Sequence, residues 1–329
     1  QLFLDHAGLA HLPDEVTRFD GLEALHLDGN RLVELPDDIK RLTHLRRLSL
    51  YDNRLETLPF VIASLHGLED LSLGKNRFHD IPAATFRLTH LRRLNLAENA
   101  LTSIPAEIGA LTQLRMFDLG HNHLRELPKE LGALTRLTDA LYLSDNLLEG
   151  IPEVIFQDMP RLRYLSLTHN PLAALPETIG NLVGLEELRL YDNGLWNLAD
   201  GVIRLAGLRE LHVQNNRLVA LPADVGKLTH LRELVASNNH LTRLPSSMTQ
   251  LRQLERLDLR NNPLESLPDE MGDMIALTHL DLRAARLTAL PDSMEALPRL
   301  EKLDLRWTKL RALPLWLDAL RERGCRVLF

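Results

Sequence analysis

The nine residues Leu22-Glu23-Ala24-Leu25-His26-Leu27-Asp28-Gly29-Asn30 contain the pattern that decides the fold of this chain. Side chains of a β-strand alternate between its two faces, so Leu25 and Leu27 point to one side and their neighbours to the other. One such strand cannot bury its leucines alone. Stacking successive strands in parallel, about 4.8 Å apart, buries the leucines in a continuous core.

The same pattern returns along the whole chain, mostly at a spacing of 23 residues. Ala7, Ala285 and Thr308 hold the ninth position in three of its 14 registers. An inward-turned asparagine at this position must find hydrogen-bond partners on neighbouring backbone. We therefore expect a ladder of buried asparagines that is interrupted at Ala285. The asparagines in register are Asn30, Asn53, Asn76, Asn99, Asn122, Asn146, Asn170, Asn193, Asn216, Asn239 and Asn262.

The full repeat, L-x-x-L-x-L-x-x-N-x-L-x-x-L-P, resembles that of the leucine-rich repeat family over essentially the whole chain. The Leu-Pro step, as at Leu35-Pro36, prevents a regular helix at that point. The resemblance implies an α/β-type leucine-rich repeat solenoid. Such a solenoid is a curved horseshoe with a parallel β-sheet on its concave face and short 3₁₀ or extended segments on its convex face. The 23-residue unit resembles intracellular scaffold proteins and many bacterial repeat proteins.

The repeats divide the chain into a repeat array over 1–314, whose first register is partial, and a C-terminal cap over 315–329. In the cap we expect a short amphipathic helix that ends at Gly324, followed by a strand at 326–328. One extra residue in the stretch 137–141 predicts a bulge where that strand begins. The N-terminal end shows no comparable cap, so we expect further chain before Gln1.

Composition excludes several classes of protein. The chain has 78 leucines among its 329 residues, and 45% of its residues are hydrophobic, which excludes a disordered chain. No apolar stretch approaches the length of a membrane span, so we expect no membrane insertion. The single cysteine, Cys325, cannot form a disulfide framework. We therefore expect a cytoplasmic protein, or one delivered into a host cytosol, rather than a disulfide-dependent extracellular protein.

Local signatures of catalysis are absent from the sequence. It contains no glycine-rich phosphate loop, no H-E-x-x-H, no C-x-x-C and no G-x-S-x-G. Cys325 lies near Arg323 and Arg326, which could lower its pKa, but a structural role in the cap is the preferred interpretation. Histidines such as His44 and His90 share a register position in separated repeats and cannot converge on zinc. We expect no enzyme activity, no cofactor and no metal site.

The tyrosines suggest a binding surface. All four lie at outward strand positions, and three of them fall on consecutive repeats near the centre of the array. Tyrosine and arginine are enriched in interface hot spots. The alternative is that exposed sheet faces favour tyrosine in any case. The predicted partner-binding residues here are Tyr142, Tyr164, Tyr191, Arg189 and His212.

Two charged columns form a second candidate surface near the C-terminus. Aspartates and arginines each recur at one outward position in three successive repeats. Such columns can set the orientation and association rate of a partner, although duplication of a repeat explains them equally well. These partner-binding candidates are Asp258, Arg260, Asp281, Arg283, Asp304 and Arg306. Trp307 can anchor a ligand at the rim, but packing against the cap is the preferred interpretation.

Four arginines, Arg46, Arg47, Arg92 and Arg93, make the outward surface of the N-terminal strands basic. Two acidic residues, Glu69 and Asp70, lie between them and interrupt any continuous track for phosphates. The net charge of −7 also fits a nucleic-acid partner poorly. We expect no nucleic-acid partner.

These observations predict a non-catalytic protein–protein interaction or scaffold module that binds a protein partner on its concave face. The alternative is a substrate-recognition or targeting domain of a larger protein, for example a secreted bacterial effector. We expect a monomer, with an edge-to-edge dimer through the uncapped N-terminus as the other possibility.

Overall fold

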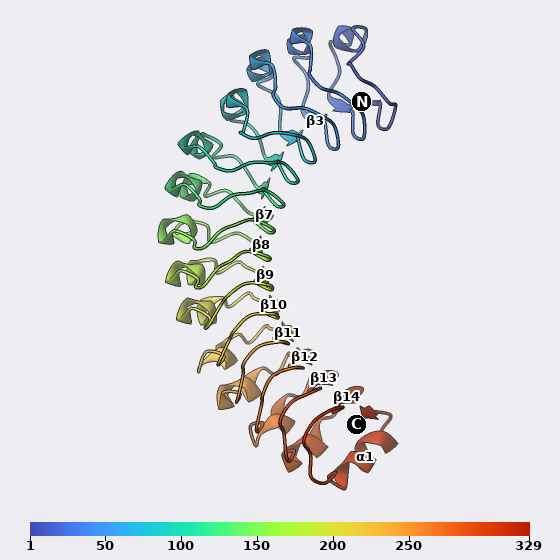
Figure 1. Ribbon diagram of the computed structural model, residues 1–329, viewed down its shortest axis with the longest axis vertical. Coiled ribbons are helices and arrows are strands. Elements are labelled where there is room, and N and C mark those ends of the chain that lie inside the picture. Colours follow the sequence, from blue (N-terminus) through green and yellow to red (C-terminus); the bar gives the residue numbers. More distant parts are fainter. The chain divides into compact units, whose positions relative to one another are not determined.

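The computed structural model describes residues Gln1–Phe329 as two compact units, Gln1–Leu162 and Arg163–Phe329. In each unit the chain winds in successive coils, with a short strand on one side and a short 3₁₀ turn on the other (Figure 1). The predicted leucine-rich repeat solenoid, with parallel strands and 3₁₀ turns, is therefore confirmed.

In unit 1 the strands pair in parallel in chain order, and equivalent residues of successive repeats lie opposite each other, as Leu25 and Leu48 do. The strands are β1 (Leu2–Phe3), β2 (Ala24–His26), β3 (Arg47–Ser49), β4 (Asp70–Ser72), β5 (Arg93–Asn95), β6 (Met116–Asp118) and β7 (Ala140–Tyr142). The 3₁₀ turns are η1 (Val16–Arg18), η2 (Asp37–Arg41), η3 (Phe60–Ser64), η4 (Ala83–Arg87), η5 (Ala106–Ala110), η6 (Lys129–Ala133) and η7 (Glu153–Phe156).

Unit 2 repeats this arrangement and ends in one α-helix and a final strand. Its strands are β8 (Tyr164–Ser166), β9 (Glu187–Arg189), β10 (Glu210–His212), β11 (Glu233–Val235), β12 (Arg256–Asp258), β13 (His279–Asp281), β14 (Lys302–Asp304) and β15 (Arg326–Leu328). Its turns are η8 (Glu177–Asn181), η9 (Asp200–Arg204), η10 (Val225–Lys227), η11 (Ser246–Gln250), η12 (Met271–Asp273) and η13 (Asp292–Ala296), and its helix is α1 (Trp316–Glu322).

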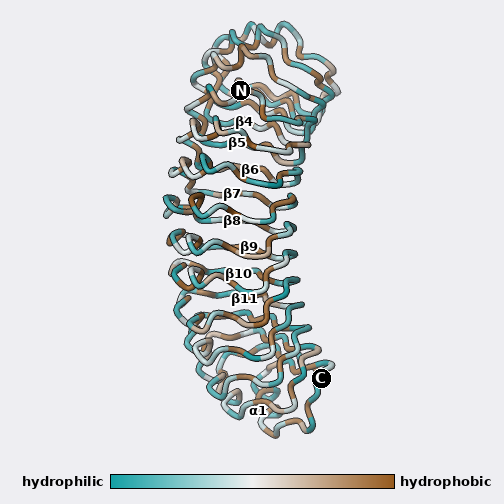
Figure 2. Tube along the Cα trace, turned by 60° about the vertical axis from the view of Figure 1, so that its left-hand side comes forward, coloured by the Kyte–Doolittle hydropathy of each residue, from teal (hydrophilic) through white to brown (hydrophobic).

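The core of each unit lies between the strands and the turns. Leu25 and Leu27 are fully buried, and the leucines at the same positions of the following repeats are buried with them. Apolar and polar stretches alternate along each coil in Figure 2. This alternation follows from the period of two within each strand, which sends one set of side chains inward and leaves the other set on the surface.

The asparagine ladder is present, as Asn122 shows. Its side-chain oxygen accepts a hydrogen bond from the backbone N–H of Leu101 at 3.0 Å. Its side-chain amide donates to the carbonyl oxygens of Leu96, Leu119 and Gly120 at 3.0, 3.0 and 3.1 Å. Each asparagine thus connects its own turn to the preceding coil, and the prediction of inward, hydrogen-bonded asparagines is confirmed.

The residue before each asparagine of the ladder has a left-handed backbone. Examples are His121 at φ +53° and His169 at φ +52°. Aspartate, asparagine and histidine tolerate this region better than most residues do, and they fill the position in most repeats. The left-handed residue turns the chain out of the strand, which lets the next side chain point inward.

The bulge predicted in repeat 7 is also present. The backbone N–H groups of Thr138, Asp139 and Ala140 all point at the carbonyl oxygen of Arg115, at 3.2, 2.8 and 3.4 Å. Ala140 then pairs with Met116 in the regular register. The extra residue is therefore accommodated before β7 begins, and the strand itself is not disturbed.

The C-terminal helix and strand form where the sequence predicts them. The backbone turns through Gly324 at φ +93° between α1 and β15. The indole N–H of Trp316 donates to the carboxylate of Asp292 at 3.2 Å, which ties the helix to the last coil. Cys325 is buried, and burial raises the pKa of its thiol more than the charge of Arg323 lowers it. The alternative of a reactive, low-pKa cysteine is therefore wrong.

No helix has the length and apolar character that crossing a membrane requires.

Candidate binding surface

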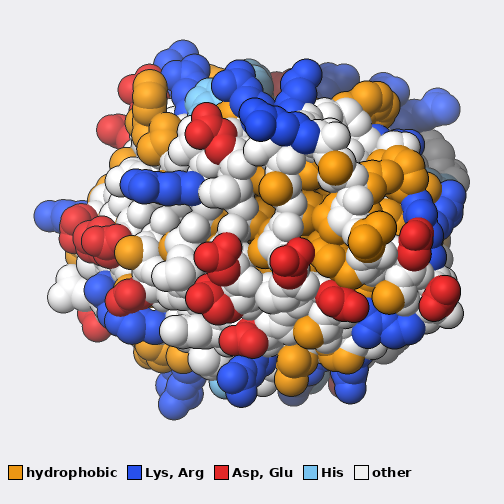
Figure 3. Space-filling view, turned by 90° about the horizontal axis from the view of Figure 1, so that it is seen from below, with side chains coloured by type: hydrophobic (Ala, Val, Ile, Leu, Met, Phe, Trp, Pro, Cys, Tyr) orange, Lys and Arg blue, Asp and Glu red, His pale blue; other side chains and the backbone are white.

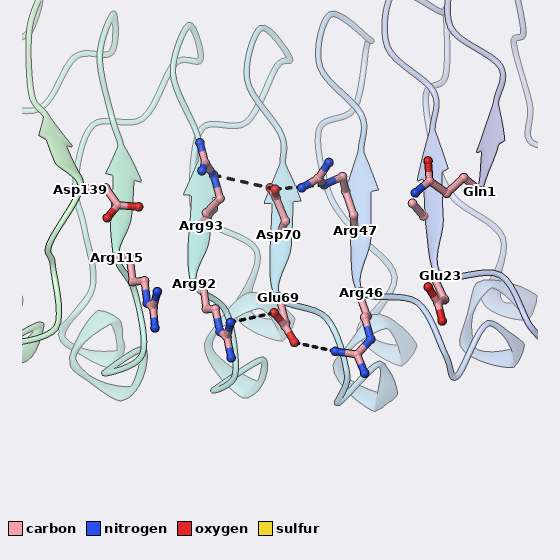
Figure 4. Close-up of a pocket in the computed structure, with 11 residues that line it drawn as sticks. Gln1, Glu23, Arg46, Arg47, Glu69, Asp70, Arg92, Arg93, Arg115 and Asp139 are labelled. Atoms are coloured by element: carbon pink, nitrogen blue, oxygen red, sulfur yellow. Dashed lines mark hydrogen bonds and ion pairs between the residues drawn. The ribbon is translucent and has the colours of Figure 1, made fainter.

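The outward side chains of the strands form one surface in each unit, which we call the strand face. In unit 1 this face holds a hollow of about 420 Å³ (Figure 4). We call it the arginine hollow, after Arg46, Arg47, Arg92, Arg93 and Arg115, which line it. A second hollow of about 300 Å³ adjoins it and adds His44, His66 and His90.

Two carboxylates organise the arginine hollow. Glu69 bridges Arg46 at 2.9 Å and Arg92 at 3.3 Å. In the neighbouring row, Asp70 bridges Arg47 at 3.2 Å and lies 3.9 Å from the guanidinium of Arg93. Figure 4 shows these two rows side by side, with each carboxylate between two guanidinium groups.

The carboxylates of the arginine hollow lie deeper than its guanidinium groups. The side chains of Glu69 and Asp70 are 29% and 24% exposed, whereas the four paired arginines are 51–65% exposed. Glu69 and Asp70 do interrupt the basic row, as predicted. Their recessed position nevertheless leaves an outer layer that is mainly positive.

Tyr51 lies elsewhere on the strand face of unit 1 and spans two repeats. Its hydroxyl donates to the carboxylate of Glu98 at 2.5 Å. The ring passes over Gly74, where a Cβ would lie only 2.9 Å from a ring carbon. The hydrogen bond to Glu98, together with burial and the negative charge nearby, raises the pKa of Tyr51 to about 12 from its ordinary 10.0.

We expect a spectrophotometric titration to show one tyrosine that ionises near pH 12. The folded-state pKa lies above the unfolded value, so the stability that this tyrosine contributes is complete below pH 10 and is lost as pH rises towards 12. Glu98→Gln should lower the pKa of Tyr51 towards 10, and Tyr51→Phe should remove the late transition. A late transition that survives in Tyr51→Phe would assign it to another tyrosine. Circular dichroism at each pH checks that the chain stays folded.

The tyrosine candidates fall in both units. Tyr142 ends β7 in unit 1, whereas Tyr164 and Tyr191 lie in unit 2. The guanidinium of Arg189 lies 5.6 Å from the centre of the Tyr164 ring, a cation–π distance. His212 pairs with Arg189 in register on the next strand. The structure thus brings Tyr164, Arg189 and His212 together within unit 2.

The neighbours of these residues include a group that sequence reasoning did not combine. Glu187, Glu210 and His212 offer ligand atoms within 4.8 Å of one another, which is close enough to hold a metal ion. Arg189 forms an ion pair with Glu187 and competes for that carboxylate. The signal in the sequence was a glutamate at the same position of consecutive strands, with a histidine two residues beyond one of them.

The aspartate and arginine columns neutralise each other. Each arginine contacts the aspartate two residues before it. Arg283 also lies 3.6 Å from Asp304. The distances are 3.3 Å for Arg260–Asp258, 2.6 Å for Arg283–Asp281 and 2.7 Å for Arg306–Asp304. These side chains therefore present paired charges to a partner.

The pKa values along the aspartate column depend on the neighbouring arginines as well as on burial. Burial raises the pKa of Asp258 more than its hydrogen bond from the Arg260 backbone and the Arg260 charge lower it. Asp304 has a completely buried side chain. Its burial alone would raise the pKa, but hydrogen bonds from Arg306 and the charges of Arg306 and Arg283 hold the pKa below its ordinary value.

A ladder of exposed amides runs along the edge of the strand face in unit 2, and sequence reasoning missed it. Asn215 donates to Asp192 at 2.8 Å. Asn238 donates to Asn215, and Asn261 donates to Asn238, each at 2.7 Å. All four residues occupy the left-handed position before an asparagine of the inward ladder. The polar residues at that position were the signal in the sequence.

Two tryptophans stand out from the surface of unit 2. Trp307 is 69% exposed, has φ +63°, and lies with its ring 5.4 Å from the guanidinium of Arg306. The preferred interpretation that Trp307 packs against the cap is therefore wrong, because the left-handed backbone turns its side chain outward. Trp196 is 56% exposed and lies 6.0 Å from the guanidinium of Arg217.

The C-terminal end of unit 2 is partly apolar. Viewed from this end, hydrophobic side chains gather over part of the face, with acidic and basic side chains around them (Figure 3). The exposed apolar residues of the C-terminal segment include Leu315 and Phe329, and the guanidinium of Arg321 lies 4.8 Å from the Phe329 ring.

Comparison with known families and structures gives one consistent result. A family described as "Leucine rich repeat" matches residues 20–78 and 66–124, and one described as "Leucine-rich repeat region" matches residues 153–236 and 220–321. No curated protein sequence matches the chain significantly.

Three solved structures illustrate the similarity. A leucine-rich repeat protein of Leptospira interrogans is 31% identical, with a TM-score of 0.82, and the match covers 100% of this chain and 95% of that one. The plant peptide hormone receptor RGFR1, in complex with RGF2, is 28% identical, with a TM-score of 0.71 and coverage of 91% and 54%. The protein of the TLR13–ssRNA13 complex is 26% identical, with a TM-score of 0.75, and the match covers 97% of this chain and 52% of that one. The chain thus spans about half of the two receptors and nearly all of the Leptospira protein.

Proposed function

The chain belongs to the leucine-rich repeat family, and from this premise we propose that it is a non-catalytic module that binds a protein partner through its strand face. The family fold is generally used for protein–protein interaction. The observation that carries the proposal is the pairing of outward aromatic rings with arginines in unit 2, at Tyr164–Arg189 and Trp307–Arg306. Aromatic and arginine side chains dominate interface hot spots.

The class of partner depends on the surface side chains, because proteins of similar fold bind different ligands. The plant receptor is in complex with RGF2, and TLR13 is in complex with ssRNA13. Glu69 and Asp70 between the arginines of unit 1, and the paired charges at Asp281–Arg283, favour a protein over a nucleic acid. A cytoplasmic location and a monomeric state remain predictions.

We expect affinity capture from a lysate of the source organism, or of its host, to retain a partner of the wild-type chain. The triple variant Tyr142→Ala, Tyr164→Ala, Tyr191→Ala should lose that partner, because truncating a hot-spot side chain costs roughly 1–3 kcal/mol of binding. Tyr51→Ala is the matched control, since this tyrosine packs over Gly74 and is not one of the candidates. Circular dichroism checks the fold of each variant.

The outcomes of this capture experiment test the tyrosine site and the proposed protein-binding function separately. Retention of the same partner by the wild type and the triple variant contradicts the tyrosine site and moves the search to Trp307 and the Asp–Arg columns. Loss of the partner in Trp307→Ala would then place the site near β14. If the wild-type chain retains no protein at all, the proposed function is wrong.

A second candidate is a recognition domain within a larger protein. It is favoured by one observation, that the chain spans about half of the plant receptor it resembles. An immunoblot of the source organism tests it. A band well above 37.4 kDa supports this candidate, and a band at 37.4 kDa contradicts it.

A further inference from the structure

The arginine hollow of unit 1 has far more hydrogen-bond donors than its own acceptors use. A guanidinium carries five N–H donors in a rigid fork. Each of the four paired arginines makes one ion pair with Glu69 or Asp70, at distances from 2.9 to 3.9 Å. Arg115 lines the same hollow without a contact to a carboxylate there (Figure 4). Most of the donors therefore remain available to a bound group.

The charge of the hollow is positive at its centre and negative at its two ends. At the centre, five arginines lie around the two recessed carboxylates, an excess of three positive charges, whereas the side chains of the whole lining carry a net charge of +1. Glu23 lies at one end of the lining and Asp139 at the other (Figure 4). An anionic ligand is attracted to the centre and repelled at either end.

These end charges limit the length of the ligand. From the arginines at β3 to Arg115 beside β6 is three strand spacings, or about 14 Å. About four residues of extended peptide cover that distance. A long polyanion such as a nucleic acid would extend beyond the arginines and meet Glu23 or Asp139.

We propose that the arginine hollow binds a short acidic segment of the protein partner, whose carboxylates take the free donors of Arg92, Arg93 and Arg115. Planar guanidinium forks match carboxylates in paired hydrogen bonds. The inference rests on the proposed function, since it supplies the chemistry of the partner. The affinity of the hollow for carboxylates can nevertheless be measured without that partner.

The test is fluorescence anisotropy with the full chain and a labelled peptide that carries a run of about four glutamates. A peptide with glutamines at the same positions is the matched probe and should bind about tenfold or more weakly. Arg93→Gln and Arg115→Gln should each raise the Kd of the glutamate peptide about tenfold. Arg77→Gln removes the same charge from an exposed residue outside the hollow and should leave the Kd within about twofold.

One variant is expected to act in the opposite direction. Asp70→Asn removes the negative charge that partly neutralises Arg47 and Arg93, so the hollow attracts carboxylates more strongly and the Kd should fall. General damage to the fold cannot produce tighter binding. Weaker or unchanged binding by Asp70→Asn would overturn the inference, as would an equal loss in Arg77→Gln.

The remaining outcomes distinguish this inference from the proposed function. If the glutamate peptide does not bind while a cellular partner is captured, the inference fails and the proposed function stands. If the peptide binds with the expected variant effects but no partner is captured, the chemistry of the hollow stands and the proposed function fails. A short single-stranded RNA that binds more tightly than the glutamate peptide would overturn the inference in favour of a nucleic acid.

Discussion

Asn122→Ala is expected to lower the free energy of unfolding by about 3 kcal/mol, one of the two largest effects we predict. The side chain of Asn122 accepts one hydrogen bond and shares its two N–H donors among three carbonyl oxygens in a buried site. Its removal leaves the N–H of Leu101 and the carbonyl of Leu96 without this partner, and it leaves a small cavity. Urea denaturation followed by circular dichroism measures the change.

Two further variants place this effect at the buried ladder. Asn261→Ala removes an amide from the exposed ladder and should cost less than about 1 kcal/mol, because water replaces the lost bond. Ala285→Asn should stabilise the chain, since the N–H of Leu264 lacks the side-chain acceptor that Asn262 gives to Leu241. Equal losses from Asn122→Ala and Asn261→Ala would contradict a stabilising role for the buried ladder.

Gly226→Ala is expected to destabilise the chain by about 2–3 kcal/mol, because an added methyl group has no space. A Cβ at Gly226 would lie 2.1 Å from the carbonyl oxygen of Ser247 in the next turn, so η10 and η11 would have to separate. The Ser247 hydroxyl ties the same turns together, since it donates to the carbonyl of Ala223 at 2.6 Å. Replacing glycine at an open position normally stabilises slightly through the unfolded chain, which makes the expected sign informative.

Gly150→Ala is the matched control for this prediction. Nothing lies within 4 Å of a Cβ built at Gly150. The variant should therefore change the free energy of unfolding by less than about 0.5 kcal/mol. If Gly226→Ala behaves like Gly150→Ala, the turns can move apart at little cost and close packing on the outer side does not contribute to stability.

The strands and the core could be predicted because the same sequence pattern is present in each repeat. The alternation around Leu25 and Leu27 fixes which side chains point inward, and the 23-residue spacing fixes the parallel register that pairs Leu25 with Leu48. A buried asparagine had to find backbone partners, so the bonds of Asn122 followed from its position alone. The bulge before Ala140 followed from one extra residue.

The details of the candidate surfaces could not be predicted in the same way. The sequence placed Glu69 between arginines but did not show that its carboxylate is recessed and that the guanidinium groups stand above it. It placed Trp307 beside the cap, where packing was expected, whereas the left-handed backbone exposes the ring. It showed neither that Arg283 reaches Asp304 nor that Glu187 approaches His212.

The sequence by itself determined the family, the parallel strands and the inward ladder of leucines and asparagines. The alternation of side chains along a strand and the length of the repeat are local properties of the sequence. Together they decide which side chains are buried. Only the tertiary structure decided which outward charges pair, which ring is exposed, and where two turns approach so closely that Gly226 has no space for a methyl group. Those features depend on the rotamers of long side chains and on distances between neighbouring coils, and neither is encoded in the spacing of the repeat.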